Sequence, residues 1–467
     1  MNMKRAGVST SVQIVSIVVA FLIGLGIMYA AAPSFVGAKT TTTTVTTTSV
    51  STATVTGGGG GTTTTSTATT STSQATGAPI SIGVNIELSG VTAPTGKEVL
   101  LGAELAASQV NDSGGINGRP LKLIVLDDQS SPTQALANAR ILNQDNVTAI
   151  FGGANSNANL AVHGYVEQSQ IPFVVASSEA SGLTSPGSHW TFRAVPDDVE
   201  WGAAMAKFLT DLNPTAKIAI VTTQFSLTQD LAAGATWYIT NQTHASIVYS
   251  QVFPTTQSDY SSAVAAIKAA NPDYILNFVF GTSIATFQRE MVQAGYPANQ
   301  IMIWGENTLD LYPIGSYGSS SYASTFFTPA FASNSTEIAN FVNSATAFLK
   351  ANPIQGEYGI DYGAFLGYRS MMIIAHALKN VSGTITRTSF RDALSTLQYT
   401  DLLGKTVSFD QNGAITPGFY VVQILQANST GWTSKPMSYI QFPTGFVPVY
   451  QLAVSVSPAT STTTTSS

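Results

Sequence analysis

The sequence predicts an α/β protein built from two Rossmann-like, doubly wound lobes. Short apolar runs alternate with segments of helical periodicity between residues 80 and 176, and the same alternation starts again between residues 217 and 304. The runs are apolar nearly throughout, as expected for parallel strands covered by helices on both faces. None of the 467 residues is a cysteine, which excludes disulfides, thiolate metal sites and cysteine nucleophiles.

The first series begins with a strand and a helix whose apolar residues share one face. Gly114 and Gly115 end that helix, and Pro132 suits the first turn of the next one, where its missing N–H leaves no hydrogen bond unmade. The expected strands are Ile80–Ile86, Leu121–Leu126, Val147–Phe151 and Ile171–Ala176, and the expected helices are Lys97–Val110, one from Pro132 and Asn157–Gln168.

The second series repeats this order and predicts a second lobe. Its expected strands are Lys217–Thr222, Ser246–Phe253, Tyr274–Phe280 and Ile301–Trp304, and its expected helices are Thr228–Asn241, Ser258–Ala270 and Ser283–Ala294. Ligands of such sheets lie beyond the carboxyl ends of the strands, so two facing lobes would enclose a ligand cleft.

The N-terminal end predicts a membrane anchor. Val12–Ala32 carries no charge and is long enough for a membrane helix, which needs about 20 residues. Lys4 and Arg5 before it favour a cytoplasmic N-terminus and an outward-facing remainder. Two alternatives stay open: a secretory signal cleaved at the small residues 36–38, and a signal resembling the pilin-type signals of some archaeal surface binding proteins, cleaved after Gly7.

A tract of Thr, Ser and Gly follows the anchor, and a similar one closes the chain. Thr40–Thr76 has too few apolar side chains to fold, and as a disordered coil it would span roughly 35 Å. Six Asn-x-Ser/Thr triplets beyond it agree with an outside location and with glycosylation. The expected domains are an anchor or signal at 1–38, a linker at 39–78, a first lobe at 79–198 plus 328–402, a second lobe at 199–327 plus 403–450, and a tail at 451–467.

Composition and motifs argue against catalysis and against nucleic acid. The chain has 19 Lys and Arg against 25 Asp and Glu, a net charge of −6, and no basic block that would bind phosphates. No metalloprotease, P-loop or nucleophile-elbow motif occurs, so neither an enzyme, nor a cofactor, nor a metal site is expected. The four histidines, His163, His189, His244 and His376, are interpreted as structural or surface residues. Asp127-Asp128 and Asp197-Asp198 are interpreted as solvated strand and helix ends, since adjacent side chains point apart.

Polar residues follow several of the expected strands. Asn155-Ser156-Asn157 opens a helix, and Ser177-Ser178-Glu179 follows the next strand. Hydroxyls and backbone N–H groups at a helix N-terminus suit a carboxylate, and a glutamate such as Glu306 suits an ammonium group. These features match the two charges of a free amino acid. The alternative is that all of them are ordinary turn and capping residues.

The sequence resembles the leucine/isoleucine/valine-binding protein family of ABC importers, which has the type I periplasmic binding fold. The resemblance is strongest over Ile80–Phe192 and continues more weakly to about Gly418. The resemblance rests on the segments 80–84 and 88–90, on Val110–Gly118 with its glycine-rich loop, on 121–123 with the paired aspartates 127–128, and on the segments 151–152, 171–172 and 192–193. It implies a ligand-carboxylate loop at Asn155 and Ser156 and a second loop at Ser177, Ser178 and Glu179. It further implies an aromatic contact at Phe280, an ammonium-binding Glu306 and another aromatic contact at Tyr358.

Three departures from the family pattern bear on the ligand. Glu179 stands where the family usually has Thr or Ser, Thr95 where many members have an aromatic lid residue, and 224–230 lacks the usual Tyr-Gly pair. An amide, a basic or polar amino acid, or another small solute therefore remains open beside a branched-chain amino acid.

The resemblance implies a receptor that closes on its ligand and delivers it to a membrane permease driven by a separate ATPase. Its lobes would be joined by a three-crossing hinge near Asp198, Phe327 and Leu403. The rival interpretation is the ligand-binding ectodomain of a sensor that works through a partner chain. The low share of charged residues, 9% against about 25% in typical domains, further predicts tolerance of acidic surroundings.

Overall fold

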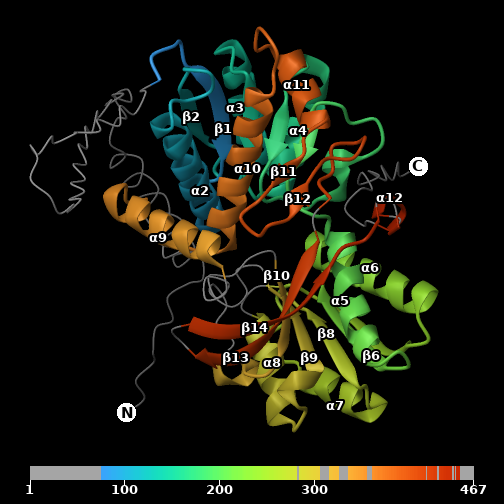
Figure 1. Ribbon diagram of the computed structural model, residues 1–467. Coiled ribbons are helices and arrows are strands. Elements are labelled where there is room, and N and C mark those ends of the chain that lie inside the picture. Colours follow the sequence, from blue (N-terminus) through green and yellow to red (C-terminus); the bar gives the residue numbers. More distant parts are fainter. Residues whose placement is uncertain are drawn as a thin grey trace, which may run out of the picture. The chain divides into compact units, whose positions relative to one another are not determined.

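The computed structural model describes residues 75–280, 283–305, 315–325, 335–354, 360–416, 418–428, 431–443, 446–447 and 449–452 (Figure 1). The predicted anchor and the predicted linker up to residue 74, the tail from 453, Glu306, Phe327 and Tyr358 lie outside these residues. Within them, no helix is long and apolar enough to cross a membrane.

The first lobe is built on a five-stranded parallel sheet, which confirms the first predicted series. The strands lie in the order β2-β1-β3-β4-β5, and every neighbouring pair is parallel. The strands are β1 (Ile80–Ile86), β2 (Leu121–Asp127), β3 (Ala149–Gly152), β4 (Phe173–Val175) and β5 (Thr191–Arg193). The helices are α2 (Ala93–Asp112), α3 (Pro132–Gln144), α4 (Ser156–Ser169), α9 (Thr336–Ala351), α10 (Tyr362–Lys379) and α11 (Arg387–Ser395).

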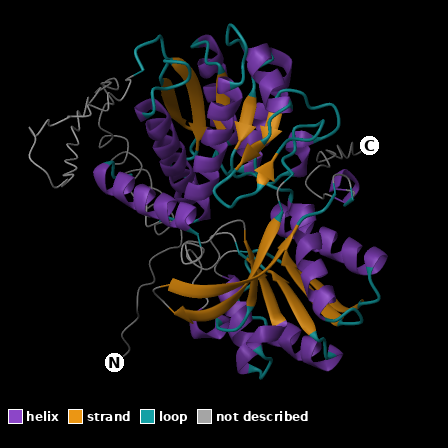
Figure 2. Ribbon diagram, viewed as in Figure 1, coloured by secondary structure: helices purple, strands orange, loops and turns teal. Residues whose placement is uncertain are grey.

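Helices cover both faces of this sheet, which explains why most residues of its strands are apolar. Ile150 and Phe173 pack with α3 and α4 in one core, whereas Phe151 and Val174, the next residues along, pack with α2 and α10 in the other. Successive side chains of a strand point to opposite faces, so β2, β3 and β4 supply both cores. Figure 2 shows helices flanking the strands.

The second lobe is built on a seven-stranded mixed sheet in the order β14-β13-β10-β9-β8-β6-β7. The strands from β10 to β7 are parallel, and β13 runs antiparallel to both β10 and β14. The strands are β6 (Lys217–Thr223), β7 (Ser246–Phe253), β8 (Tyr274–Phe278), β9 (Ile301–Trp304), β10 (Tyr322–Thr325), β13 (Phe419–Asn428) and β14 (Gly431–Ile440). The helices are α5 (Asp198–Leu212), α6 (Ser226–Gln242), α7 (Ser261–Ala270), α8 (Ser283–Gln293) and α12 (Val449–Leu452).

Shorter elements complete the described chain. They are the hairpin β11 (Tyr399–Thr400) with β12 (Thr406–Val407) and the 3₁₀ turns η1 (Ser181–Thr184), η2 (Ala298–Gln300) and η3 (Gly315–Gly318). Beside the hairpin, Arg369 of α10 contacts Asp401 at 3.7 Å between Nη1 and Oδ2 and donates from Nη2 to the Ala194 carbonyl. These contacts join segments that are distant in sequence and buried together.

Each lobe contains one helix pair that is held close by glycines. In the first lobe, a Cβ on Gly102 of α2 would lie 1.9 Å from the carbonyl oxygen of Ala364 in α10. In the second lobe, a Cβ on Gly202 of α5 would lie 1.8 Å from the carbonyl oxygen of Leu231 in α6. Glycine is therefore required at both crossings, because any side chain would push the helices apart.

Candidate functional site

The loop after β3 delivers the first group of predicted site residues to the N-terminus of α4. Asn155 caps this helix: its Oδ1 accepts from the Ala158 N–H at 3.0 Å, and its Nδ2 donates to Thr92 Oγ1 at 3.2 Å. Both ends of the Asn155 amide therefore make hydrogen bonds that fix the conformation of this loop. Ser156 opens the helix, where the unpaired N–H groups of the first turn favour an anionic ligand group.

The structure brings the two predicted loops together through a pair of hydroxyls. Ser178, which follows β4, donates from Oγ to Ser156 Oγ at 3.0 Å. Its neighbour Ser177 is 1% exposed, and its Oγ has no hydrogen-bond partner within the described parts of the chain. Glu179 is 2% exposed and lies in the same segment. The Ser177 hydroxyl is one of several unpartnered buried hydroxyls in the described chain, and a ligand atom or a water at this position would complete its hydrogen bonding.

A buried carboxyl that was not predicted from the sequence accepts a hydrogen bond from the loop after β3. Glu87, one residue beyond β1, is fully buried, and its Oε1 accepts from the Ala154 N–H at 2.7 Å. Burial, reinforced by the nearby Asp128 carboxylate, raises the pKa of Glu87 to about 8 against the opposing backbone N–H groups of Ala154 and Asn155. The carboxyl is therefore largely protonated at neutral pH.

Two glycines make room for the Glu87 side chain. A Cβ on Gly96 would lie 2.6 Å from Glu87 Cγ, and a Cβ on Gly153 would lie 2.4 Å from Glu87 Oε2. That oxygen accepts no hydrogen bond from any described residue. The clue in the sequence was a charged residue placed directly after an apolar strand.

The interpretation of the paired aspartates as solvated ends is wrong for three of the four residues. Asp128, Asp197 and Asp198 are only 2%, 1% and 2% exposed. Asp197 caps α5 by accepting from the Val199 N–H and contacts Arg193 at 3.2 Å. Burial raises the pKa of Asp128 to about 6, against a hydrogen bond from the Ser130 N–H. The sequence shows that these residues follow strands or start helices, but it does not show that tertiary packing buries their carboxyl groups.

Asp127 is the partly exposed member, and it ties two loops together. Its Oδ1 accepts from the N–H groups of Leu88 and Gln129, at 2.9 and 2.8 Å, and its Oδ2 accepts from Ser89 Oγ at 2.7 Å. Although partial burial acts to raise its pKa, these hydrogen bonds lower it below the ordinary value. Asp127 is therefore a structural carboxylate.

In the second lobe, Phe280 follows β8 and is partly buried. Its ring is stacked on Trp304, the last residue of β9, at 6.1 Å between centroids and 11° between planes. It is also stacked on Phe225, which follows β6, at 4.0 Å and 28°. Phe225 was overlooked because its segment lacks the family's usual Tyr-Gly pair. The predicted Glu306 comes two residues after Trp304 and, like Tyr358, lies outside the described residues.

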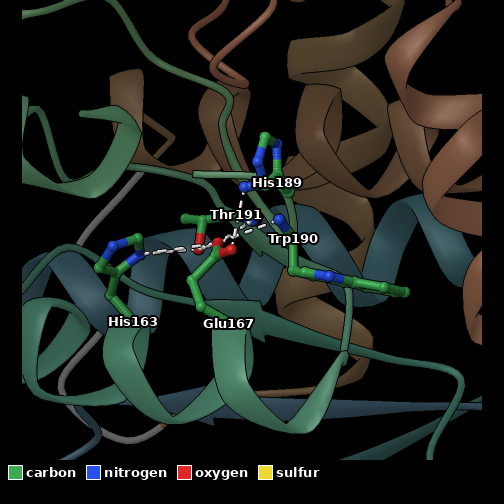
Figure 3. Close-up of polar contacts among 5 residues, drawn as sticks. All are labelled: His163, Glu167, His189, Trp190 and Thr191. Carbon is green, nitrogen blue, oxygen red and sulfur yellow. Dashed lines mark hydrogen bonds and ion pairs between the residues drawn. The ribbon is translucent and has the colours of Figure 1, made fainter. Parts of the chain in front are cut away.

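Two of the four histidines lie near the hydrogen-bond network of the half-buried Glu167 at the start of β5 (Figure 3). Glu167 accepts from the backbone N–H groups of His189, Trp190 and Thr191 and from Thr191 Oγ1, all within 3.0 Å. His163 Nδ1 lies 2.9 Å from Thr191 Oγ1, and burial lowers the pKa of His163 despite the adjacent Glu167. The His189 ring points away from the carboxylate. The network anchors the loop before β5.

A pocket of about 190 Å³ opens beside this network, between the start of β5 and α11. Its lining includes His189, Thr191, Arg391 and Asp410. The predicted site residues, in contrast, follow the carboxyl ends of β3 and β4, where ligands of parallel sheets bind. This pocket is therefore separate from the candidate site. Among the described residues, no cluster of three or more His, Asp or Glu side chains could hold a metal ion.

Comparison with known proteins shows the family and the fold of this chain. A family model described as periplasmic binding protein matches residues 79–430. The Leu/Ile/Val-binding protein homolog 1 of Brucella melitensis is 26% identical over 224 residues, which cover 48% of this chain and 60% of that protein. The chain thus aligns with less than two thirds of the length of such relatives.

Solved structures match over a larger part of the fold. The ABC transporter substrate-binding protein of Sphaerobacter thermophilus superimposes with a TM-score of 0.68 and 21% identity, covering 78% of this chain and 98% of that one. The solute-binding protein of Rhodopseudomonas palustris in complex with 3,4-dihydroxybenzoic acid superimposes with a TM-score of 0.64 and 18% identity. The match covers 78% of this chain and 97% of that one.

Proposed function

This chain belongs to the periplasmic binding protein family, of the Leu/Ile/Val-binding type, and on that premise we propose that it is the extracellular receptor of an ABC importer. Its fold is the type I periplasmic binding fold, as the sequence predicts. The receptor would bind a small solute and deliver it to a membrane permease powered by a separate ATPase. Its relatives are binding proteins, which supports a receptor role over an enzymatic one.

The hydroxyl pair Ser156–Ser178 carries the proposal for the ligand. Ser156 opens α4, Ser177 next to Ser178 has an Oγ without a partner among the described residues, and none of the eight predicted site residues is a lysine or arginine. Such a set of neutral donors suits a carboxylate. The relatives support this choice, since leucine, isoleucine, valine and 3,4-dihydroxybenzoic acid all carry a carboxylate. The ligand is then an amino acid, branched-chain or related, or a similar small carboxylate.

The remaining site residues take roles that follow from their chemistry. Asn155 holds the carboxylate loop, Phe280 and Tyr358 supply aromatic contacts, and Glu306 takes an ammonium group where the ligand has one. Glu179 is the residue that restricts the ligand, because an ionised carboxylate there would repel the ligand's own. With both Glu179 and Glu306 ionised, an amino acid would bind in preference to a plain carboxylic acid; with Glu179 protonated, a plain carboxylic acid would also fit.

Lobe closure is the proposed working step. The ligand would bind one lobe and stabilise the closed form through contacts with the other, to the extent that it binds the closed form more tightly than the open form. The lobes would be 79–198 plus 328–402 and 199–327 plus 403–450, with crossings near Asp198, Phe327 and Leu403. The N-terminal segment would hold the receptor at the outer face of the membrane, with the Thr/Ser/Gly tract as its tether.

Serine substitutions test the carboxylate site. We expect Ser156→Ala and Ser178→Ala each to weaken binding of the best-bound carboxylate, measured by titration calorimetry. A hydrogen bond to a charged group contributes about 1.5–3 kcal/mol, or roughly 10- to 150-fold in Kd. Ser262→Ala, on the exposed face of α7, is the matched control and should leave the Kd unchanged. Unchanged binding in both site variants would refute the carboxylate assignment.

A further inference from the structure

Three aromatic rings lie in a row at the carboxyl edge of the second sheet. Trp304, Phe280 and Phe225 come at or just after the ends of β9, β8 and β6, which are neighbours in that order. The planes of Trp304 and Phe280 differ by 11°, and those of Phe280 and Phe225 by 28°. We call these three residues the aromatic row. Trp304 and Phe280 are near-parallel but offset, at 6.1 Å between centroids, whereas Phe225 stacks on Phe280 at 4.0 Å, which leaves the other face of the Phe225 ring at the end of the row.

The aromatic row runs from the core to the surface. Trp304 is 1% exposed and donates from Nε1 to the Val279 carbonyl at 3.1 Å, which fixes the buried end. Phe280 is partly buried, and Phe225 at the other end is 37% exposed. The row therefore ends in an exposed ring whose support is rigid.

Phe225 differs in exposure from the aromatic residue that ends the neighbouring strand. Phe253, at the end of the adjacent strand β7, is 2% exposed and is covered by Tyr260 at 4.9 Å between ring centroids. The backbone of Phe225 is held in place, since its carbonyl accepts from the Gln229 N–H at 3.0 Å and its N–H donates to the Thr223 carbonyl at 2.8 Å. Single exposed apolar side chains are common, but Phe225 is the end of a stacked row and follows the carboxyl end of a strand, where ligands of such sheets bind.

We propose that the aromatic row binds a planar ring of the solute, with Phe225 as the specificity-determining contact, so that the ligand is an aromatic carboxylic acid or aromatic amino acid. This inference rests on the proposed function, because the first lobe must take the carboxylate of the same molecule. Stacked aromatic rings attract one another beyond the area they bury, through their quadrupoles. An aliphatic ligand group of equal size gains only the free energy of burying its apolar surface.

Matched pairs of probes test the inference on the full chain. Benzoate and cyclohexanecarboxylate have the same carbon skeleton but differ in planarity, as do phenylalanine and cyclohexylalanine. Titration calorimetry should show at least one planar member binding about tenfold or more tightly than its saturated partner. Phe225→Leu, which removes the ring but keeps apolar volume, should bring that ratio close to one, whereas Phe225→Tyr should preserve it. Ile141→Ala, at an exposed apolar residue of α3, is the control that should change nothing.

The outcomes separate this inference from the proposed function. Equal binding within both pairs, or tight binding of leucine with neither aromatic probe bound, would overturn the aromatic assignment and leave the receptor role standing. A preference for planar probes that survives Phe225→Leu would also overturn it, because the ring contact would lie elsewhere. If no carboxylate of any kind binds to the folded chain, the proposed function fails together with the inference.

Discussion

At the scale of single residues, the most unusual feature is the buried carboxyl of Glu87. The sequence shows that Ser156 and Ser178 each follow a strand, and in the structure their loops meet because β3 and β4 are neighbouring parallel strands. It does not predict the burial of Glu87, which depends on Gly96 and Gly153 lying against it from two other segments. Local patterns report which strand a residue follows, but not which distant segments cover its side chain.

Glu87 predicts a pH dependence of stability. With a folded pKa of about 8 and an ordinary value of 4.5, the folded state holds a proton that the unfolded state releases between these values. The contribution of Glu87 to stability is therefore full below about pH 4.5 and is lost as the pH rises toward 8. One pKa unit corresponds to about 1.4 kcal/mol, so the total change is of the order of 4–5 kcal/mol.

A neutral isostere isolates this effect. We expect Glu87→Gln to match the wild type in melting temperature at pH 5 and to exceed it at pH 8, because the amide cannot ionise. Asp112→Asn, at an exposed carboxylate that ends α2, serves as the control and should follow the wild-type profile. A Glu87→Gln variant that loses stability equally at both pH values would show that packing, not ionisation, dominates at this position.

At the scale of elements, the two glycine-mediated helix crossings explain how each lobe is held together. The sequence predicts α2 and α6 from their periodicity, with starts shifted by a few residues. It does not reveal β5, β10 or the β13–β14 hairpin. Strand β5 is three residues long and includes Arg193, whose N–H and carbonyl bond to Gly413 and Ile415 far along the chain. Such a strand exists through tertiary pairing rather than through a local pattern.

The α2–α10 crossing gives a stability prediction. Gly102→Ala should destabilise the protein by about 1–3 kcal/mol, the usual range for overpacking, because the new Cβ would meet the Ala364 carbonyl. Gly164→Ala is the matched control. It lies within α4 with nothing inside 4 Å of the new Cβ, and it should stabilise by roughly 0.5–1 kcal/mol through helix propensity. Urea unfolding measures both, and a Gly102→Ala variant as stable as the wild type would refute the close crossing.

At the scale of the whole molecule, several raised carboxyl pKa values act in the same direction. Burial is the main cause at Glu87, Asp128 and Glu200, where the pKa values are about 8, 6 and 7. Each group favours the folded state more at low pH than at neutral pH. This agrees with the acid tolerance that the low charge density predicts.

The placement of the hinge crossings stays a prediction, and the one near Phe327 lies outside the described residues.

The full chain should therefore melt at least as high at pH 4.5 as at pH 7.5. Scanning calorimetry across this range measures the trend, with Glu87→Gln expected to flatten it. A melting temperature that falls steadily from pH 7.5 to pH 4.5 would contradict the account. In that case, carboxylates whose pKa is lowered in the folded state, as at Asp127, would outweigh the buried protonated ones.

The central claim is that this receptor recognises a small carboxylate, and a thermal-shift screen of the full chain tests it most directly. The panel would contain aliphatic and aromatic amino acids, aromatic acids, their amides and neutral sugars. A true ligand at about 100 times its Kd adds about 2.7 kcal/mol, which shifts the melting temperature by a few degrees. The account predicts such a shift for a carboxylate and none for its amide. A shift produced by amides or sugars alone, with no carboxylate active, would contradict it.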